Sequence, residues 1–348
     1  MAYTTINKPS LYFNTVLYAG NNGASQSITG AGFKPDWVWI KNRTDARNHV
    51  LTDIVRGVTK TLFSQSTSAE VTNPTDGYLS SFDSDGFSVS QGSVNNENVC
   101  ATDNYVSWNW LASNTSGSSN TAGSITSTVA ANTTSGFSIV SYTGTGANAT
   151  VGHGLGVAPK MIITKSRGTT NNWGTYHHSL GNTDALFLNL TDAKDTSSTY
   201  WNNTSPTSSV FSVGSAAGTN PSATMIAYCF AEVKGYSKFG SYTGNGNADG
   251  TFVYTGFKPS FVLWKRTDFA NGWFIFDNKR NSFNPEDKYL LPYASDAEGT
   301  LTAVDFLSNG FKLKSSTAAF NASGGTFIYM AFAENPFVSS TLVPTTAR

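Results

Sequence analysis

The sequence predicts an all-β protein made of three tandem, related antiparallel domains of the β-sandwich or jelly-roll type. Three observations lead to this fold class: a threefold internal repeat, a composition that suits strands and turns, and the lack of apolar residues at helical spacing. Charged residues make up only 13% of the 348-residue chain and aromatic residues another 13%, beside 32 glycines and long runs of Ser, Thr and Asn. Such a profile favours strands and tight turns over helices.

The repeat is defined by a motif in which Gly, two residues, Pro, five residues and Lys follow one another. The three copies are Gly32, Pro35 and Lys41; Gly156, Pro159 and Lys165; and Gly256, Pro259 and Lys265. An aromatic strand ending in Tyr-x-Gly precedes each copy, and a hydrophobic strand closes it, at 105–110, 225–230 and 327–332. A fixed internal period has to be interpreted first, because it sets the whole architecture.

Polar and aromatic positions also recur downstream of the proline. Fourteen residues after it stand Trp173 and Trp273, with His49 in the first copy. Eighteen residues after it stand Asp53, His177 and Asp277, and the first and third copies add Arg56 and Arg280 three residues later. We expect the tryptophans to be core residues, with stacking on sugar rings as the alternative. For His177 we expect a polar structural contact, as for the aspartates beside their arginines.

Strand patterns support the fold class. Residues 37–40, 161–163 and 261–264 are apolar on both faces, as expected for central strands that are covered on both sides. Residues 82–89 and 306–313 place Asp-Gly or Asn-Gly between aromatic strand residues, which is a strong hairpin signal.

The repeat divides the chain into parts. We predict repeat 1 at 1–112, repeat 2 at 137–233 and repeat 3 at 234–337. Between the first two repeats, 19 of the 24 residues from 113 to 136 are Ser, Thr, Asn or Gly, which predicts a linker or flexible arm. We therefore expect repeats 2 and 3 to pack as a pair and repeat 1 to be more loosely tethered. Residues 338–348 lack a periodic pattern and are predicted to be a surface tail.

Charge and cysteine content limit the kinds of partner and the cellular compartment that the sequence suggests. The formal net charge is zero, so electrostatics gives no indication of a nucleic-acid or anionic-membrane partner. The first residues lack the apolar core of a secretory signal, and no run reaches the length of a membrane span. Cys100 and Cys229 occupy non-equivalent places, so we expect no disulfide and take Cys229 as a small core residue. Synthesis in a cytoplasm combined with an extracellular type of composition is typical of viral surface proteins.

Candidate metal and histidine chemistry has simpler explanations. The segment 83–86 resembles a fragment of a calcium loop but lacks the further oxygen ligands, so a turn is favoured over a metal site. His177 and His178 are neighbours on a strand and point to opposite faces, which argues against shared metal ligation. For His153 we expect hydrogen bonding within its loop rather than catalysis or ligation.

The sequence contains no recognisable catalytic motif. There is no nucleophile elbow, and only six Glu are present, of which Glu232 and Glu334 are repeat equivalents and are interpreted as structural rather than as an acid and base pair. The recurring Lys41, Lys165 and Lys265 are interpreted as strand-end lysines that keep their ammonium groups in solvent. We assign no catalytic, cofactor, metal or ligand-binding residue and expect a protein that is not an enzyme.

Five segments carry a resemblance to a known family. They are 2–6, 32–43, 136–144, 152–159 and 329–337. Together they resemble a family of virion structural and tail-fibre proteins of marine tailed bacteriophages, built on a repeated β domain of unknown function. The likeness covers nearly the whole chain, but its motifs mark scaffold positions rather than a site.

The resemblance implies a non-enzymatic virion protein on the outside of the particle. A tail-fibre or receptor-binding component that recognises the host surface is the first expectation. A head decoration protein on the capsid exterior is the alternative, and a polysaccharide depolymerase is a weaker one. Expected partners are other virion proteins, further copies of the chain in a trimer, and a host surface glycan. We expect no cofactor, no nucleic acid and no membrane insertion.

Overall fold

A computed structural model describes residues 4–281, 283–336 and 338. The predicted fold class is confirmed, because the chain is built of β-strands and each ladder between the named strands is antiparallel. In the described part, helix is confined to η1 (Pro9–Leu11), α1 (Ser198–Trp201) and α2 (Ala318–Asn321). Apart from residue 338, the predicted C-terminal tail lies outside the described residues.

Each repeat contributes sheets that enclose an apolar layer. In repeat 1 the order of one sheet is β1-β9-β3-β4 and of the other β2-β8-β7, with a small β5-β6 ribbon. The bounds are β1 (Phe13–Ala19), β2 (Ser25–Thr29), β3 (Trp37–Asn42), β4 (Val50–Asp53), β5 (Lys60–Thr61), β6 (Val71–Thr72), β7 (Tyr78–Asp83), β8 (Gly86–Ser90) and β9 (Asn104–Trp110).

Repeat 2 has a longer main sheet, in the order β10-β11-β12-β19-β14-β15-β16-β17, and a β13-β18 pair. The bounds are β10 (Ser118–Asn120), β11 (Ser127–Asn132), β12 (Phe137–Thr143), β13 (Ala149–Gly152), β14 (Met161–Ser166), β15 (Gly174–His177), β16 (Asp184–Phe187), β17 (Asp195–Thr196), β18 (Val210–Val213) and β19 (Thr224–Phe230).

Repeat 3 returns to the pattern of repeat 1, with one sheet in the order β20-β27-β22-β23 and another in the order β21-β26-β25-β24. The bounds are β20 (Ser237–Thr243), β21 (Phe252–Tyr254), β22 (Phe257–Arg266), β23 (Trp273–Asp277), β24 (Glu286–Tyr289), β25 (Gly299–Leu307), β26 (Gly310–Leu313) and β27 (Thr326–Pro336). The four-stranded order of the first sheet is thus the same in repeats 1 and 3, and repeat 2 contains it as β12-β19-β14-β15.

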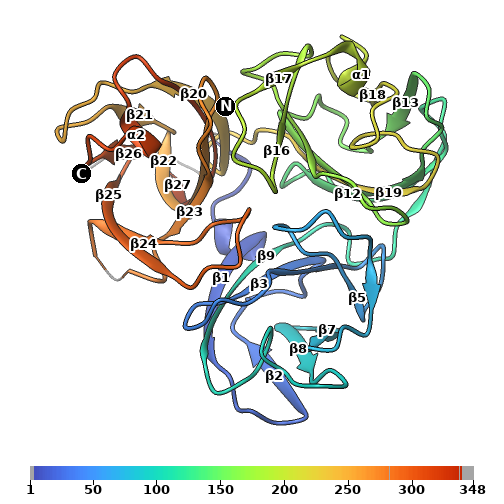
Figure 1. Ribbon diagram of the computed structural model, residues 1–348, viewed down its shortest axis with the longest axis horizontal. Coiled ribbons are helices and arrows are strands. Elements are labelled where there is room, and N and C mark those ends of the chain that lie inside the picture. The colour runs from blue at the N-terminus through green and yellow to red at the C-terminus, as the bar shows by residue number, and fades with distance from the viewer. Residues whose placement is uncertain (1–3, 282, 337, 339–348) are drawn as a thin grey trace.

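The three repeats surround a common centre (Figure 1). One face of each main sheet packs on its own repeat's second sheet, and the other face packs into a central core shared by all three repeats. Strand β3 shows the alternation, since Trp37 and Trp39 point to the central core while Val38 and Ile40 point to the core of repeat 1. This placement explains why such strands are apolar on both faces.

Aromatic rings join the repeats at the centre. Trp37 of repeat 1 stacks on Tyr228 of repeat 2, with ring centroids 4.2 Å apart. Phe13 of repeat 1 stacks on Phe332 of repeat 3 at 4.8 Å, and Phe332 lies edge-on to Phe230 of repeat 2 at 6.2 Å. Repeat 1 is therefore part of the central core, and the expectation that it is loosely tethered beside a pair formed by repeats 2 and 3 is wrong.

The predicted linker at 113–136 is also corrected. It contains β10 and β11, and β11 pairs with β12 along the edge of the main sheet of repeat 2. Ala130 is buried in the central core, and Val129 on the opposite face is buried in the core of repeat 2. The small polar residues therefore belong to edge strands with a few buried apolar positions, and not to a free arm.

Both predicted hairpins are confirmed. Strands β7 and β8 pair Asp83 with Gly86, and β25 and β26 pair Leu307 with Gly310. Gly86 has a φ of +146°, and a Cβ at this residue would lie 2.0 Å from the carbonyl oxygen of Ile28. Glycine is required there because the neighbouring strand β2 approaches so closely. The turn interpretation of 83–86 is thus correct, and the Asp85 carboxylate accepts the backbone N–H groups of Gly30 and Gly32.

Candidate functional site

The recurring lysines lie at the contacts between repeats, which we call seams. Lys41, Lys165 and Lys265 are fully buried, so the interpretation of solvated strand-end lysines is wrong. Each ammonium donates to the carbonyl of the next residue in its own chain segment and to a carbonyl of another repeat. The interrepeat acceptors are Ser295 for Lys41 (3.1 Å), Thr67 for Lys165 (3.1 Å) and Thr191 for Lys265 (3.3 Å).

These contacts close a ring. Repeat 1 donates to repeat 3 at the 1–3 seam, repeat 2 donates to repeat 1 at the 2–1 seam, and repeat 3 donates to repeat 2 at the 3–2 seam. Burial lowers the pKa of Lys41 to about 7 and the pKa of both Lys165 and Lys265 to about 8. Desolvation of the ammonium is the largest cause in each case.

The acceptor loops form a second repeat that the sequence analysis missed. Their equivalent positions are Phe63, Thr67 and Glu70; Phe187, Thr191 and Lys194; and Leu291, Ser295 and Glu298, each spaced by four and three residues. Backbone N–H groups at the third position donate to the residue two places after the recurring lysine in all three seams. The three loops share the same spacing, but their residue types differ at equivalent positions, so the residue pattern does not mark them as a repeat.

The tryptophans serve the same seams, and their assignment to the core is confirmed. Trp173 is buried, and its indole N–H donates to the carbonyls of Phe63 and Ser66 in repeat 1. Trp273 donates in the same way to Phe187 in repeat 2. In repeat 1 the buried His49 takes the place of Trp, and its Nε2 lies 3.0 Å from the carbonyl oxygen of Leu291 in repeat 3.

The aspartates pair with the arginines three residues later, as expected. The Asp53–Arg56 and Asp277–Arg280 side chains are completely buried. Each aspartate also accepts a hydrogen bond from the repeat that donates to its own repeat in the ring. The donors are the Tyr228 hydroxyl of repeat 2 at 2.8 Å for Asp53 and the indole N–H of Trp108 of repeat 1 at 3.0 Å for Asp277.

The residue type at position 177 can be explained by the residue that repeat 3 has at the equivalent contact position. The position equivalent to Trp108 and Tyr228 is Met330, which has no donor to offer a carboxylate. Repeat 2 accordingly has His177 in place of the aspartate, and its Nε2 lies 3.2 Å from the carbonyl oxygen of Tyr329. Burial lowers the pKa of His177 to about 3, so the ring is neutral and can donate to that carbonyl. The predicted polar structural contact is confirmed.

Two seams contain a further ion triad. At the 2–1 seam, the Glu70 carboxylate lies between Arg167 at 3.0 Å and Arg56 at 3.2 Å. At the 1–3 seam, Glu298 lies between Arg43 at 2.8 Å and Arg280 at 3.3 Å. In each of these seams a carboxylate pairs with a guanidinium from each of two repeats, so the loss of one member would leave a largely desolvated charge without its partner.

The remaining predicted residues are structural where the chain is described. The buried His153 accepts the N–H of Leu155 and lies 3.1 Å from the Thr207 carbonyl oxygen, so the loop assignment is confirmed. Cys100 and Cys229 are free and buried, and Cys229 belongs to the core of repeat 2. Glu232 and Glu334 form the ion pairs Lys238–Glu232 and Lys258–Glu334, both at 2.7 Å.

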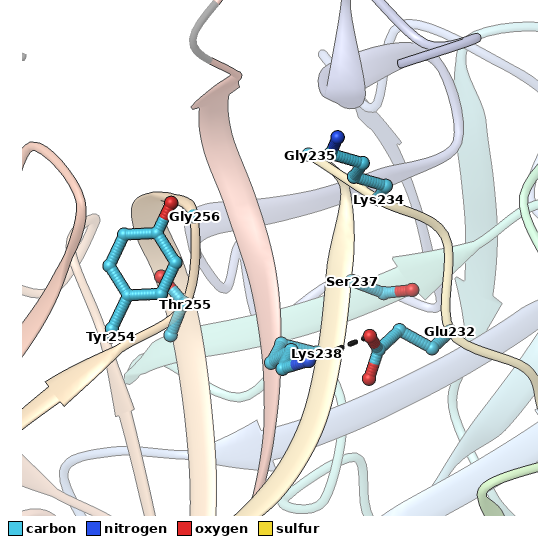
Figure 2. Close-up of a pocket in the computed structure, with 8 residues that line it drawn as sticks. All are labelled: Glu232, Lys234, Gly235, Ser237, Lys238, Tyr254, Thr255 and Gly256. Carbon is cyan, nitrogen blue, oxygen red and sulfur yellow. Dashed lines mark hydrogen bonds and ion pairs between the residues drawn. The ribbon is translucent and has the colours of Figure 1, made fainter. Parts of the chain in front are cut away.

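A hollow of about 420 Å³ lies where repeat 2 passes into repeat 3. Figure 2 shows Tyr254 on one side of it and the Glu232–Lys238 ion pair on the other. Tyr254 is 58% exposed, and its neighbour on the same face of β21, Phe252, is 44% exposed. With Phe269 and Phe283 they make four strongly exposed aromatic side chains among the described residues, and all four belong to repeat 3.

A smaller hollow of about 220 Å³ brings together two carboxyl groups that the sequence did not connect, Glu286 and Glu334. Glu286 is 3% exposed, and burial, followed by the nearby charge of Asp277, raises its pKa to about 8. Glu334 is held as an ion pair by Lys258. Two carboxyl groups in different environments are the combination used in acid and base catalysis on glycosides, and here Glu286 is buried whereas the Glu334 side chain is 32% exposed.

The described ranges hold no group of three or more His, Cys, Asp or Glu side chains that could bind a metal ion. Nor does this part of the chain contain a helix of the length and apolarity needed to cross a membrane.

The fold and its sites define a class: an all-β protein made of repeats whose recurring charged and aromatic residues hold the repeats to one another. Residues 8–336 match the family described as a domain of unknown function, DUF7483, and the chain belongs to this family. The match spans all three repeats as one unit. Searches of curated proteins and of solved structures gave no match.

Proposed function

We propose that this chain is a non-enzymatic structural protein on the outside of a bacteriophage particle, and that it acts as a tail-fibre or receptor-binding component. One observation carries the proposal. The recurring Lys, Asp, Arg and Trp side chains are used to bind the three repeats together, and not to form a reaction centre. A stably assembled chain of this kind suits a component on the outside of a particle. The resemblance to bacteriophage virion proteins indicates which kind of particle this is.

Recognition of a surface glycan is assigned to repeat 3, because its exposed aromatic side chains can stack on sugar rings. Tyr254 and Phe252 lie on one face of β21, beside the hollow that Tyr254 lines. Alanine at both positions is expected to weaken attachment to host cells, measured by flow cytometry with fluorescently labelled protein. Alanine at the equally apolar but distant Val94 serves as the control. Unchanged attachment of the double variant would remove repeat 3 from the recognition role.

The location is tested by antibody-gold labelling of purified particles of the phage that encodes the chain. Gold on the tail or its fibres is the expected result. Gold over the head would instead make the chain a decoration protein, and unlabelled particles that still contain other virion proteins would contradict the proposal as a whole.

A second candidate is a polysaccharide depolymerase, and the hollow that contains Glu286 and Glu334 is the observation that favours it. The test is incubation with host surface polysaccharide and an assay for new reducing ends, with Glu286→Gln as the matched variant. New ends with the wild type and none with the variant would establish an enzyme. No new ends with either protein is the outcome expected from the structural proposal.

A further inference from the structure

The 3–2 seam departs from the other two at the place of the ion triad. The first guanidinium, supplied by Arg43 and Arg167, is replaced by the hydroxyl of Thr267. The shared carboxylate of Glu298 and Glu70 is replaced by the ammonium of Lys194, and the second guanidinium, supplied by Arg280 and Arg56, is replaced by the side chain of Leu180. The backbone contact persists, since the N–H of Lys194 donates to the carbonyl of Thr267 at 2.9 Å. The backbone pairing between the two repeats is therefore the same at this seam as at the others, whereas the ion triad is absent.

A hollow of about 360 Å³ occupies the vacated place. Thr267, Lys194 and Leu180 all line it, and so does Ser241. Ser241 is the equivalent of Ser141, which accepts a hydrogen bond from Arg167 at 3.3 Å in the 2–1 seam. The hollow thus lies where the 2–1 seam holds a guanidinium group.

The lining has a distinct chemistry. Hydroxyl side chains predominate, and Lys194 is the one charged residue among the lining residues. The Ser and Thr positions are Ser179, Ser241, Thr243, Thr267 and Thr326, while the hydroxyl of Tyr242, which also lines the hollow, donates to the carbonyl of Phe320. Leu180 and Ile328 add apolar surface. Lys194 is paired with Asp184 at 2.6 Å but remains 44% exposed, and an ammonium has three donors, so the pair leaves donor capacity for a ligand.

We propose that the hollow at the 3–2 seam is a binding site for a small hydroxylated carboxylic acid, of the size and chemistry of a uronic-acid sugar unit. The carboxylate of the ligand lies against the Lys194 ammonium, and its hydroxyls exchange hydrogen bonds with the Ser and Thr side chains. The ligand replaces, with opposite polarity, the carboxylate and guanidinium groups that fill the other two seams.

A repeat protein that abandons a stabilising contact in one copy out of three, while keeping the register, loses stability there. Such local departures from a protein's own pattern are typical of functional sites, where stability is lower in exchange for binding. The inference deepens the proposed function by naming a ligand class and rests on it only for its biological meaning. Binding is measured on the purified chain, so a negative result leaves the particle labelling unaffected.

The test is titration of the full chain with sodium glucuronate, followed by isothermal calorimetry and by chemical shifts of the Thr and Ser resonances of the seam. Glucose and acetate are the comparison probes, because one carries only hydroxyls and the other only a carboxylate. Glucuronate is expected to bind most tightly. Equal binding of glucose would overturn the assignment of an acid, and no binding of glucuronate would overturn the site.

Two variants place the binding at the seam. Lys194→Ala is expected to weaken glucuronate binding by about tenfold or more, the usual effect of losing a charge-assisted hydrogen bond. The matched control is Lys314→Ala, since Lys314 is 39% exposed, is also paired with a carboxylate, and is not among the residues that line the hollow. Equal weakening in both variants would contradict the proposal.

The triple variant Leu180→Arg, Lys194→Glu and Thr267→Arg restores the triad of the other seams. It is expected to raise the melting temperature and to abolish glucuronate binding. A triple variant that is more stable and still binds glucuronate as the wild type does would overturn the site. If this variant fails to fold, Thr267→Arg alone fills part of the hollow and is judged by the same binding criterion.

Discussion

At the scale of single residues, the buried lysines make the stability of the chain depend on pH. Lys41, Lys165 and Lys265 have pKa values of about 7, 8 and 8 in the folded chain, against about 10.4 in an unfolded one. Between these values the unfolded state binds more protons, so stability rises with pH. The contribution is fully present above the unfolded pKa and is lost as pH falls through the folded pKa.

We predict that replacing Lys41 by Met removes part of this pH dependence. The difference in unfolding free energy between the wild type and Lys41→Met is expected to shift in favour of the wild type as pH rises from 7 to about 9.5. Urea unfolding at a series of pH values measures it, and Lys160→Met is the control because Lys160 is partly exposed. A difference that stays constant over this range would show that the Lys41 ammonium is not desolvated in the folded chain.

The aspartate and arginine pairs give a second prediction at this scale. Asp277→Asn leaves the buried guanidinium of Arg280 without its closest carboxylate and is expected to lower the free energy of unfolding by about 3–5 kcal/mol. Asp305→Asn, which breaks the looser and more exposed pair with Lys314 at 3.5 Å, is expected to cost less than about 1 kcal/mol. Denaturant unfolding compares the two, and equal losses would contradict the structural role of Asp277.

Residue patterns were informative where both partners lie close in sequence. The three-residue spacing of Asp53 and Arg56 was enough to expect their contact. The burial of Lys41, Lys165 and Lys265 could not be predicted, because a strand end is exposed in an isolated sheet and is covered here by a loop from another repeat. The hollow at the 3–2 seam was hidden for the same reason, since its lining residues come from two repeats.

At the scale of elements, the segment between repeats 1 and 2 shows where composition misleads. Ser, Thr and Asn are typical of linkers, but Val129 and Ala130 suffice to bury both faces of β11 because its backbone pairs with β12. A six-residue strand near the sheet edge, paired with β10 on one side and β12 on the other, needs few large side chains when the ladders satisfy its backbone. The fold class, by contrast, could be predicted, since the repeat and the two-sided apolar strands are local in sequence.

We predict that the backbone amides of β11 exchange with solvent slowly. Those that pair with β12 are expected to be protected for minutes or longer, whereas a flexible linker would exchange within seconds. Hydrogen exchange followed by mass spectrometry of peptides covering 127–132 and 137–143 makes the comparison. Ala130→Asp is expected to remove the protection and to destabilise the whole chain, because it places a carboxylate in the central core. Full exchange of 127–132 at the first time point in the wild type would contradict the strand.

At the scale of the whole molecule, the chain itself has the organisation that a trimer of single repeats would have. Each repeat donates to the next around a ring, and the largest aromatic side chains are mostly buried within one chain. Association into trimers remains a prediction. If it occurs, it has to use surfaces other than the central core, and the exposed aromatic side chains of repeat 3 are one apolar surface that could serve.

The shared core also predicts how the chain unfolds. Trp37 contacts Tyr228 and Phe137 of repeat 2 as well as Trp110 of its own repeat, so no repeat can leave without exposing large apolar surface on the others. We therefore expect one cooperative transition in calorimetry, with equal calorimetric and van't Hoff enthalpies. Trp37→Ala is expected to lower the free energy of unfolding by about 3–5 kcal/mol and to move this single transition without splitting it. A separate transition for repeat 1 would mean that it folds independently and would restore the picture of a tethered domain.

The isolated segment 137–233 offers a second measurement, because without repeats 1 and 3 its face of the central core is exposed, and it is expected to remain unfolded or to aggregate.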